Sequence, residues 1–177
     1  MQRTRLGIVP CYVVTLCLAL AGGTILNAQD ADTSAADKAA IEKATEQYRK
    51  AFEARDVDGI MAQYAPGDSL FVFDCTPPRE YRGWAAYKKD WQDLLDLFPG
   101  PIKDMVSDLD VTVVGTVAYS HHIESSEFTQ KDGSRKSLVV RVTDVYRKID
   151  GNWLIVLEHV SFPVDPMSGQ ADLLSKP

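Results

Sequence analysis

Two strand-forming runs in the last third of the chain flank the pair Asp150-Gly151. An Asp-Gly pair between two such runs is the strongest short-range signal of a tight β-hairpin. Charged and polar residues interrupt the apolar ones on both runs: Arg141, Asp144, Glu158 and His159. An unpaired charge is costly to bury in a closed core. We therefore expect at least one face of this hairpin to line a pocket.

The first residues of the chain are typical of an export signal. Arg3 and Arg5 make the start basic, and an apolar run follows. The run is short and ends in small residues that suit cleavage, after Ala21 or after Ala28. We therefore expect a signal peptide over residues 1–28 and an exported protein, periplasmic or secreted. An uncleaved membrane anchor is the alternative.

Export determines which cysteines remain in the mature protein. Cys11 and Cys17 would leave with the signal, so that Cys75 stands alone and forms no internal disulfide. The same cleavage removes two basic residues and no acidic ones, which changes the formal net charge from −6 to −8. This acidic balance makes nucleic acid a poor partner and disfavours anionic membrane surfaces once the signal is removed.

The rest of the chain has the length of one domain, over residues 37–165, after a small-residue linker over 29–36 and before a tail over 166–177. Helical periodicity and capping residues predict three helices, over about residues 37–55, 56–64 and 83–98. Alternation and turn residues predict strands over about residues 69–74, 105–114, 116–129, 137–149 and 153–163. Helices followed by a run of antiparallel strands indicate an α+β fold. We expect a curved sheet that encloses a conical cavity.

Three segments resemble one known superfamily. The ending at residues 150–161 is similar to the closing hairpin of the NTF2-like superfamily, in its SnoaL-like and ketosteroid-isomerase-like branches. Residues 56–64 are similar to the second helix of that superfamily, and Arg82-Gly83 fits the start of its third helix. The resemblance spans residues 37–165. It implies an NTF2-like cone, in which three N-terminal helices pack on a strongly curved, mainly antiparallel sheet of four to five strands, and a homodimer.

The ketosteroid isomerase pattern can be compared residue by residue. Three residues match it in type and spacing: Tyr48, Asp74 and Asp144. The resemblance implies that Asp74 is a general base and that Tyr48 and a protonated Asp144 donate hydrogen bonds to an enolate oxygen. A buried, protonated Asp in this role is a known feature of that isomerase, so the role of Asp144 comes from the resemblance alone.

Each of these residues also has a structural alternative. Tyr48 would then be a core phenol that hydrogen-bonds a carbonyl. Asp74 would end a strand and hydrogen-bond the backbone next to it. Asp144 would form an ion pair with one of three neighbours: Arg141, Arg147 or His121.

The turn type decides which hairpin residues face the cavity. A three-residue loop at 149–151 would place Asp144 opposite Val156, whereas a two-residue turn would place it opposite Leu157. With the three-residue loop, Glu158 shares the cavity face with Asp144. The candidate ligand-binding residues are Tyr64, Trp84, Trp91, His121 and Glu158.

Metal binding is not expected, because the neighbours His121 and His122 would point to opposite faces of one strand. No cofactor is expected either. The sequence therefore predicts an exported protein with a pocket for a hydrophobic or carbonyl-containing molecule. By resemblance, its activity would be that of a cofactor-free isomerase or cyclase that abstracts a proton next to a carbonyl. The alternative is a ligand-binding or self-association module of the same fold without catalysis.

Overall fold

The protein is described by a computed structural model that covers residues 21–175, with side chains from residue 33 onward. The helices are α1 (Ala21–Glu53), α2 (Val57–Met61), the short 3-10 helix η1 (Gly67–Ser69) and α3 (Trp84–Leu97). The strands are β1 (Phe71–Phe73), β2 (Tyr81–Arg82), β3 (Ile102–Val114), β4 (Val117–Thr129), β5 (Arg135–Ile149) and β6 (Asn152–Ser161). Most of the predicted signal peptide, residues 1–20, lies outside the described residues.

Helix α1 begins earlier than the sequence predicted. Residues 29–36, where we expected a linker, are helical. The segment is rich in alanine and contains no proline, so nothing in it interrupts a helix. From its C-terminal half, Ile41 and Phe52 are buried in the core. Within residues 21–175, no helix combines the length and the apolar character needed to span a membrane.

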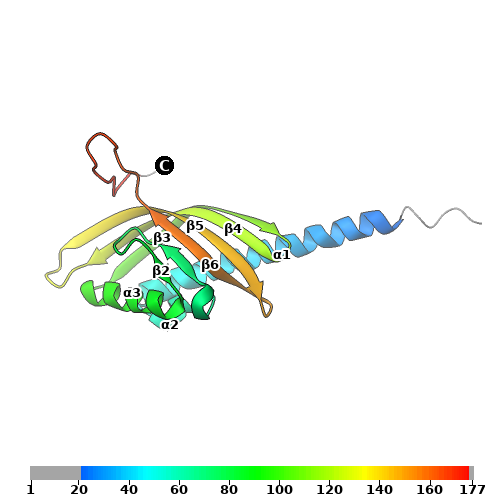
Figure 1. Ribbon diagram of the computed structural model, residues 1–177, viewed down its shortest axis with the longest axis horizontal. Coiled ribbons are helices and arrows are strands. Elements are labelled where there is room, and N and C mark those ends of the chain that lie inside the picture. Colours follow the sequence, from blue (N-terminus) through cyan, green and yellow to red (C-terminus); the bar gives the residue numbers. More distant parts are fainter. Residues whose placement is uncertain (1–20, 176–177) are drawn as a thin grey trace, which may run out of the picture. The chain divides into compact units, whose positions relative to one another are not determined.

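The strands form one curved sheet in the order β2-β1-β6-β5-β4-β3 (Figure 1). The sheet has six strands, so the predicted four to five is wrong. The missed strand, β2, has only two residues and follows two prolines, which leaves no alternation to detect. Strands β3 to β6 pair antiparallel, whereas β1 runs parallel to β6.

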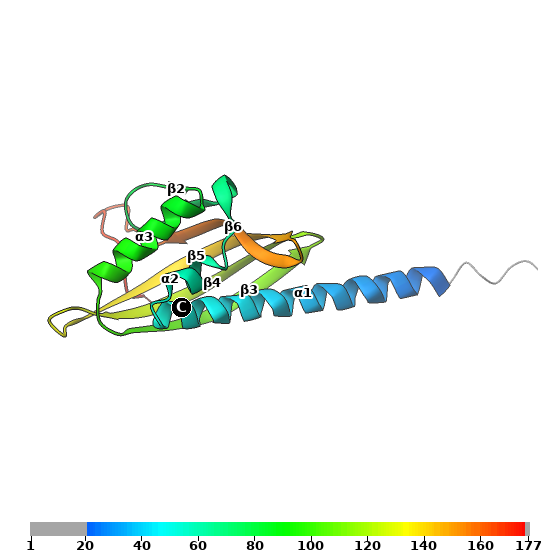
Figure 2. The ribbon, with the colours of Figure 1, turned by 90° about the horizontal axis from the view of Figure 1, so that it is seen from below.

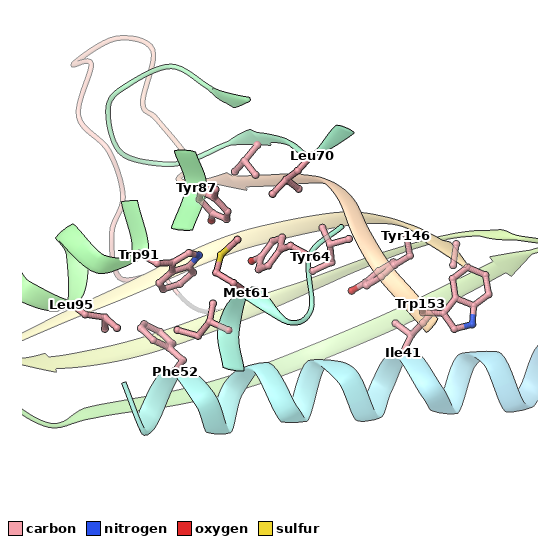
Figure 3. Packing of buried hydrophobic residues seen from close by; sticks show 14 of the residues in the cluster. Ile41, Phe52, Met61, Tyr64, Leu70, Tyr87, Trp91, Leu95, Tyr146 and Trp153 are labelled. Atoms are coloured by element: carbon pink, nitrogen blue, oxygen red, sulfur yellow. The ribbon is translucent and has the colours of Figure 1, made fainter. Parts of the chain in front are cut away.

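One face of the sheet carries the core. Along β4, every second residue from Ala118 to Phe128 is buried. Helices α1, α2 and α3 contribute buried side chains to the same cluster, and Figure 2 shows α2 and α3 in front of the strands. In Figure 3, Phe52, Trp91 and Tyr87 project toward one another from α1 and α3. Their ring centroids lie 5.2 and 6.0 Å apart in successive edge-on contacts, which aromatic rings favour.

The closing hairpin has a two-residue turn and a bulge. Asp150 and Gly151 both have positive φ, 49° and 83°, as a type I′ turn requires. The register then shifts, because Tyr146 pairs with Ile155 while Val145 pairs with Leu157. Val156 is therefore the extra residue of a β-bulge.

The bulge corrects both predicted registers. Asp144 lies opposite Glu158, and neither Val156 nor Leu157 is its partner. Because side chains alternate between faces, one extra residue keeps Ile155 and Glu158 both on the core face. The predicted proximity of Asp144 and Glu158 is present, although the turn alone would not produce it.

The bulge residue itself should therefore be dispensable for the facing of β6. Deletion of Val156 joins Ile155 to Leu157 in a regular ladder and leaves Ile155 and Glu158 both on the core face. Deletion of Leu154 places Trp153 next to Ile155, so one of these two buried residues must turn to the outer face. We expect the Leu154 deletion to lower the free energy of unfolding by about 3 kcal/mol or more, and by clearly more than the Val156 deletion. Urea unfolding followed by circular dichroism measures both, and equal stability of the two variants would contradict the register.

Candidate functional site

A cavity of about 300 Å³ lies between the helices and the inner face of the sheet. We call it the chamber. Its walls are mostly aromatic and aliphatic: Phe52, Trp91, Leu94, Leu97, Phe128, Leu138, Val140, Val142 and Val160. Carboxyl groups interrupt these walls: Asp74, Asp90, Asp93, Glu124 and Glu158. Among the described residues that line the chamber there is no Lys, Arg or His.

A second, much smaller cavity adjoins the chamber. This recess has about 20 Å³ of space, enough for about one water-sized group. Its polar lining comes from the helical regions and the sheet: Thr45, Tyr48, Gln63, Tyr64, His122, Glu124, Asp144, Tyr146 and Glu158. Tyr48, Glu124 and Glu158 line both cavities and therefore mark where they meet.

Glu158 is a buried carboxyl held by two phenols. The Tyr64 hydroxyl donates to its Oε1 at 2.9 Å and the Tyr87 hydroxyl donates to its Oε2 at 2.7 Å. Burial, reinforced by the nearby charge of Asp144, raises the pKa of Glu158 well above its usual range. Glu158 therefore keeps its proton to a higher pH than an exposed carboxyl does.

Asp74 lies where β1 ends, at a wall of the chamber. Its Oδ1 accepts a hydrogen bond from the Thr76 backbone N–H at 3.1 Å, which was the structural alternative for this residue. The Tyr87 hydroxyl lies 3.4 Å from its Oδ2. Tyr87 therefore lies between a carboxylate near the surface and the buried acid Glu158.

Asp144 faces the recess from β5. Its Oδ2 accepts hydrogen bonds from the hydroxyls of Tyr146 at 3.0 Å and Ser120 at 3.3 Å. Its Oδ1 is buried and has no hydrogen-bond partner among the described residues. Burial raises the pKa of Asp144 to about 6. Two of the three predicted ion-pair partners of Asp144 make other contacts. His121 lies beside Asp110, and Arg141 donates a hydrogen bond to the Phe162 carbonyl.

Two further carboxyls lie on neighbouring strands, Glu124 on β4, which lines the recess, and Asp104 on the edge strand β3. Glu124 on β4 accepts a long hydrogen bond from Tyr48, at 3.4 Å, and lies 3.8 Å from Nε2 of His122. Asp104 on β3 accepts from Ser126 at 2.7 Å. Burial raises the pKa of Glu124 to about 7, and burial together with the charge of Glu124 raises the pKa of Asp104 to about 8. Burial lowers the pKa of His122, which is therefore a neutral imidazole.

The structure separates the three residues that the isomerase pattern combined. Asp74 and Tyr48 line the chamber, whereas Asp144 lines the recess, and only Tyr48 faces both. Of the other candidates, Trp91 lines the chamber, Tyr64 lines the recess and Glu158 lines both. Trp84 lines neither cavity, because its Nε1 donates to the Met61 carbonyl in the core.

Of the two neighbouring histidines, His122 lines the recess and His121 does not. The His121 side chain is 62% exposed on the outer face, where it lies 3.9 Å from Asp110. Its neighbour His122 faces the recess, because Ser120 pairs with Asp144 and fixes which residues of β4 point inward. The sequence reasoning also missed Tyr87 and Glu124. The sequence did contain a signal for the polar inner face of β4, because every second residue is polar: Ser120, His122, Glu124 and Ser126.

Cys75 also lines the chamber, beside Asp74. Burial raises the pKa of its thiol to about 12, so the unreactive thiol is the dominant form. Among residues 21–175, no cluster of three or more His, Cys, Asp or Glu side chains is arranged to hold a metal ion.

Comparison with known proteins places this arrangement in a family. The model of the SnoaL-like domain matches residues 41–165. The chain belongs to the SnoaL-like domain family. The predicted NTF2-like, ketosteroid-isomerase-like resemblance is thereby confirmed for the fold. A search of curated proteins finds no match.

Solved structures of this fold resemble the chain over most of its length. An NTF2-like protein of unknown function from Pseudomonas putida is 28% identical, covers 81% of this chain and 99% of its own, and superposes with a TM-score of 0.73. A putative scytalone dehydratase from Novosphingobium aromaticivorans is 20% identical, with 73% and 86% coverage and a TM-score of 0.66. A ketosteroid isomerase-like protein from Erwinia carotovora is 18% identical, with 71% and 95% coverage and a TM-score of 0.60.

The buried carboxyls predict a fall in stability with rising pH. Folding raises the pKa of Glu124 from 4.5 to about 7, so the folded state binds more protons than the unfolded state between these values. The free energy of unfolding should therefore fall as the pH rises through this window, by about 3 kcal/mol from Glu124. Glu124→Gln should flatten this fall and be more stable than the wild type at pH 8.

Urea unfolding at pH 5 and pH 8 tests this pH dependence. The matched control is Glu127→Gln on the same strand, where the side chain is 32% exposed and pairs with Arg135. We expect this control to keep the pH dependence of the wild type. A wild type that is equally stable at both pH values would show that the buried acids ionise without cost.

Proposed function

We propose that the protein binds a small, largely apolar molecule in the chamber and transfers a proton on it without a cofactor. The observation that carries the proposal is the pair of acids on the chamber wall, Asp74 and Glu158, with the Tyr87 hydroxyl between them at 3.4 and 2.7 Å. Such a pair supplies the two groups that isomerisation next to a carbonyl needs, a base and an acid.

The proposed reaction conserves protons. Asp74 takes a proton from a carbon next to a carbonyl, the C–H electrons form a C=C bond, and the carbonyl oxygen receives the proton of Glu158. The protonated Asp74 then returns a proton to another carbon, and the enol proton goes back to Glu158. The Tyr87 hydroxyl lies within hydrogen-bonding reach of both acids and can carry protons between them. This assignment gives Glu158 the donor role that the isomerase pattern assigned to Asp144.

Two further features support a carbonyl ligand. The indole N–H of Trp91 is buried on the chamber wall and has no acceptor among the described residues, so a ligand oxygen would satisfy it. The solved structures with this fold include proteins named as a ketosteroid isomerase-like protein and a putative scytalone dehydratase. Both names belong to chemistry on small organic molecules, which is the class of ligand that the chamber suits.

The test is hydrogen exchange on carbon. A panel of small cyclic ketones is incubated with the protein in D₂O, and NMR follows deuterium entry next to the carbonyl. We expect Asp74→Asn to slow the protein-catalysed exchange by a factor of about 10² or more, because a positioned base is lost. The control is Asp93→Asn, a chamber carboxylate with a 62% exposed side chain, which should change the rate less than about threefold.

The alternative is a binding module without catalysis. The apolar walls of the chamber and the tyrosines that already hold Glu158 would serve such a module equally well. Ketones that bind to the wild type with no exchange above the rate in buffer would favour this alternative and overturn the enzymatic proposal.

A further inference from the structure

Two buried polar atoms at the wall of the recess have no hydrogen-bond partner among the described residues, Oδ1 of Asp144 and Nδ1 of His122. The two residues are 3% and 6% exposed, and both line the recess. Buried polar atoms are normally hydrogen-bonded, so two such atoms at one small cavity mark a place where a polar ligand group can bind.

The histidine is an acceptor and not a cation. Burial lowers the pKa of His122, which keeps the imidazole neutral. Its Nε2 is on the side of the Glu124 carboxyl, 3.8 Å away, so the inference places the proton on Nε2, which leaves a lone pair on Nδ1. A group that enters the recess must therefore donate hydrogen bonds.

The charges around the recess favour a cation. Three carboxyls line it, Glu124, Asp144 and Glu158, and no Lys or Arg among the described residues lines it or the chamber. Once Glu124 and Asp144 have lost their protons, a carboxylate would be repelled there, whereas a positive charge would be paired. The net charge of −6 attracts cations to the protein as a whole.

Size and shape narrow the class of cation. The recess has about 20 Å³ of space, which suits one ammonium group but not a planar guanidinium. The residues 21–175 offer no cluster that could hold a metal ion. The adjoining chamber of about 300 Å³ is mostly apolar and would take a hydrocarbon or aromatic body.

We infer that the ligand of this cavity is a primary amine, with its ammonium group in the recess between Asp144, His122 and Glu124 and its apolar body in the chamber. This inference rests on the proposed use of the chamber for a small molecule, and it names the polar end of that molecule. The ammonium N–H groups would donate hydrogen bonds to Asp144 Oδ1, to His122 Nδ1 and to the Glu124 carboxylate.

Amine binding is then linked to proton release. Burial raises the pKa of Asp144 to about 6 and that of Glu124 to about 7, so both must lose a proton before they pair with an ammonium group. The other titratable groups that face the recess come from every surrounding element: Tyr48 from α1, Tyr64 after α2, His122 from β4, Tyr146 from β5 and Glu158 from β6. The tyrosines stay neutral, because burial raises their pKa values well above the usual range.

The test compares three probes with the same hydrocarbon tail, hexylamine, 1-hexanol and hexanoate, by isothermal titration calorimetry. At pH 8, hexylamine should bind at least about 10-fold tighter than 1-hexanol, and hexanoate should bind more weakly than either. Between pH 8 and pH 5, the affinity for hexylamine should fall about 10-fold or more while that for 1-hexanol changes less than about threefold. Near pH 6, where Glu124 and part of Asp144 still carry protons, the measured heat should depend on the buffer, because binding releases protons.

Two matched variants locate the ammonium group. Asp144→Asn should weaken hexylamine binding about 30-fold or more and change 1-hexanol binding less than about threefold. Asp110→Asn makes the same substitution on the outer face of the sheet, outside both cavities, where the side chain is 59% exposed, and should change hexylamine binding less than about threefold. Thermal melting by circular dichroism confirms that each variant is folded. The amine and alcohol comparison on the wild type needs no variant, so it tests the inference even if Asp144→Asn does not fold.

Equal affinities for hexylamine and 1-hexanol at both pH values would overturn the inference and show that the recess holds water alone. Binding of neither probe would overturn it as well. The proposed proton transfer is tested separately, by the ketone exchange that depends on Asp74. A failure of amine binding therefore does not decide the outcome of that test.

Discussion

The inner face of the sheet buries several carboxyl groups without a basic partner, and the rest of the site depends on this imbalance. Water would solvate such charges strongly, so their burial is tolerable only if they are neutral or hydrogen-bonded. The chain uses both means. Phenols hold Glu158 and Asp144, while Glu124 and Asp104 keep protons at pH values where exposed acids have lost them. The cavity can therefore supply protons or attract a cation through its own side chains.

The hairpin shows how far the sequence can predict the site. The Asp150-Gly151 pair predicts a tight turn, which is present. Charged residues among apolar ones predict a pocket face, and two of them, Asp144 and Glu158, are buried on the inner face of the sheet. The register was not predictable in the same way. The bulge at Val156 arises from pairing with both neighbours, β5 on one side and β1 on the other, and no local residue pattern marks it. The position of the bulge determines which residues of β6, among them Glu158 and Val160, face the chamber.

The errors elsewhere have a similar physical origin. Alternation shows that His121 and His122 face opposite sides, but only the pairing of Ser120 with Asp144 determines which of them is inside. The two-residue strand β2 exists because β1 is beside it, and its own sequence has no strand signal. The extent of α1 through residues 29–36 was predictable from its alanine content, although small residues of this kind also suit a linker. Export and dimerisation stay predictions.

The carboxyls of the inner face lie on four neighbouring strands, with Asp104 on β3, Glu124 on β4, Asp144 on β5 and Glu158 on β6. Their pKa values depend on one another, because the charge of Asp144 acts on Glu158 and that of Glu124 acts on Asp104 and Asp144. The four acids therefore titrate as one system, in which a proton removed at one site is partly recovered at another. In double-mutant cycles, we expect substitutions at these positions to be non-additive, so the energetic effect of one acid depends on the protonation of the others.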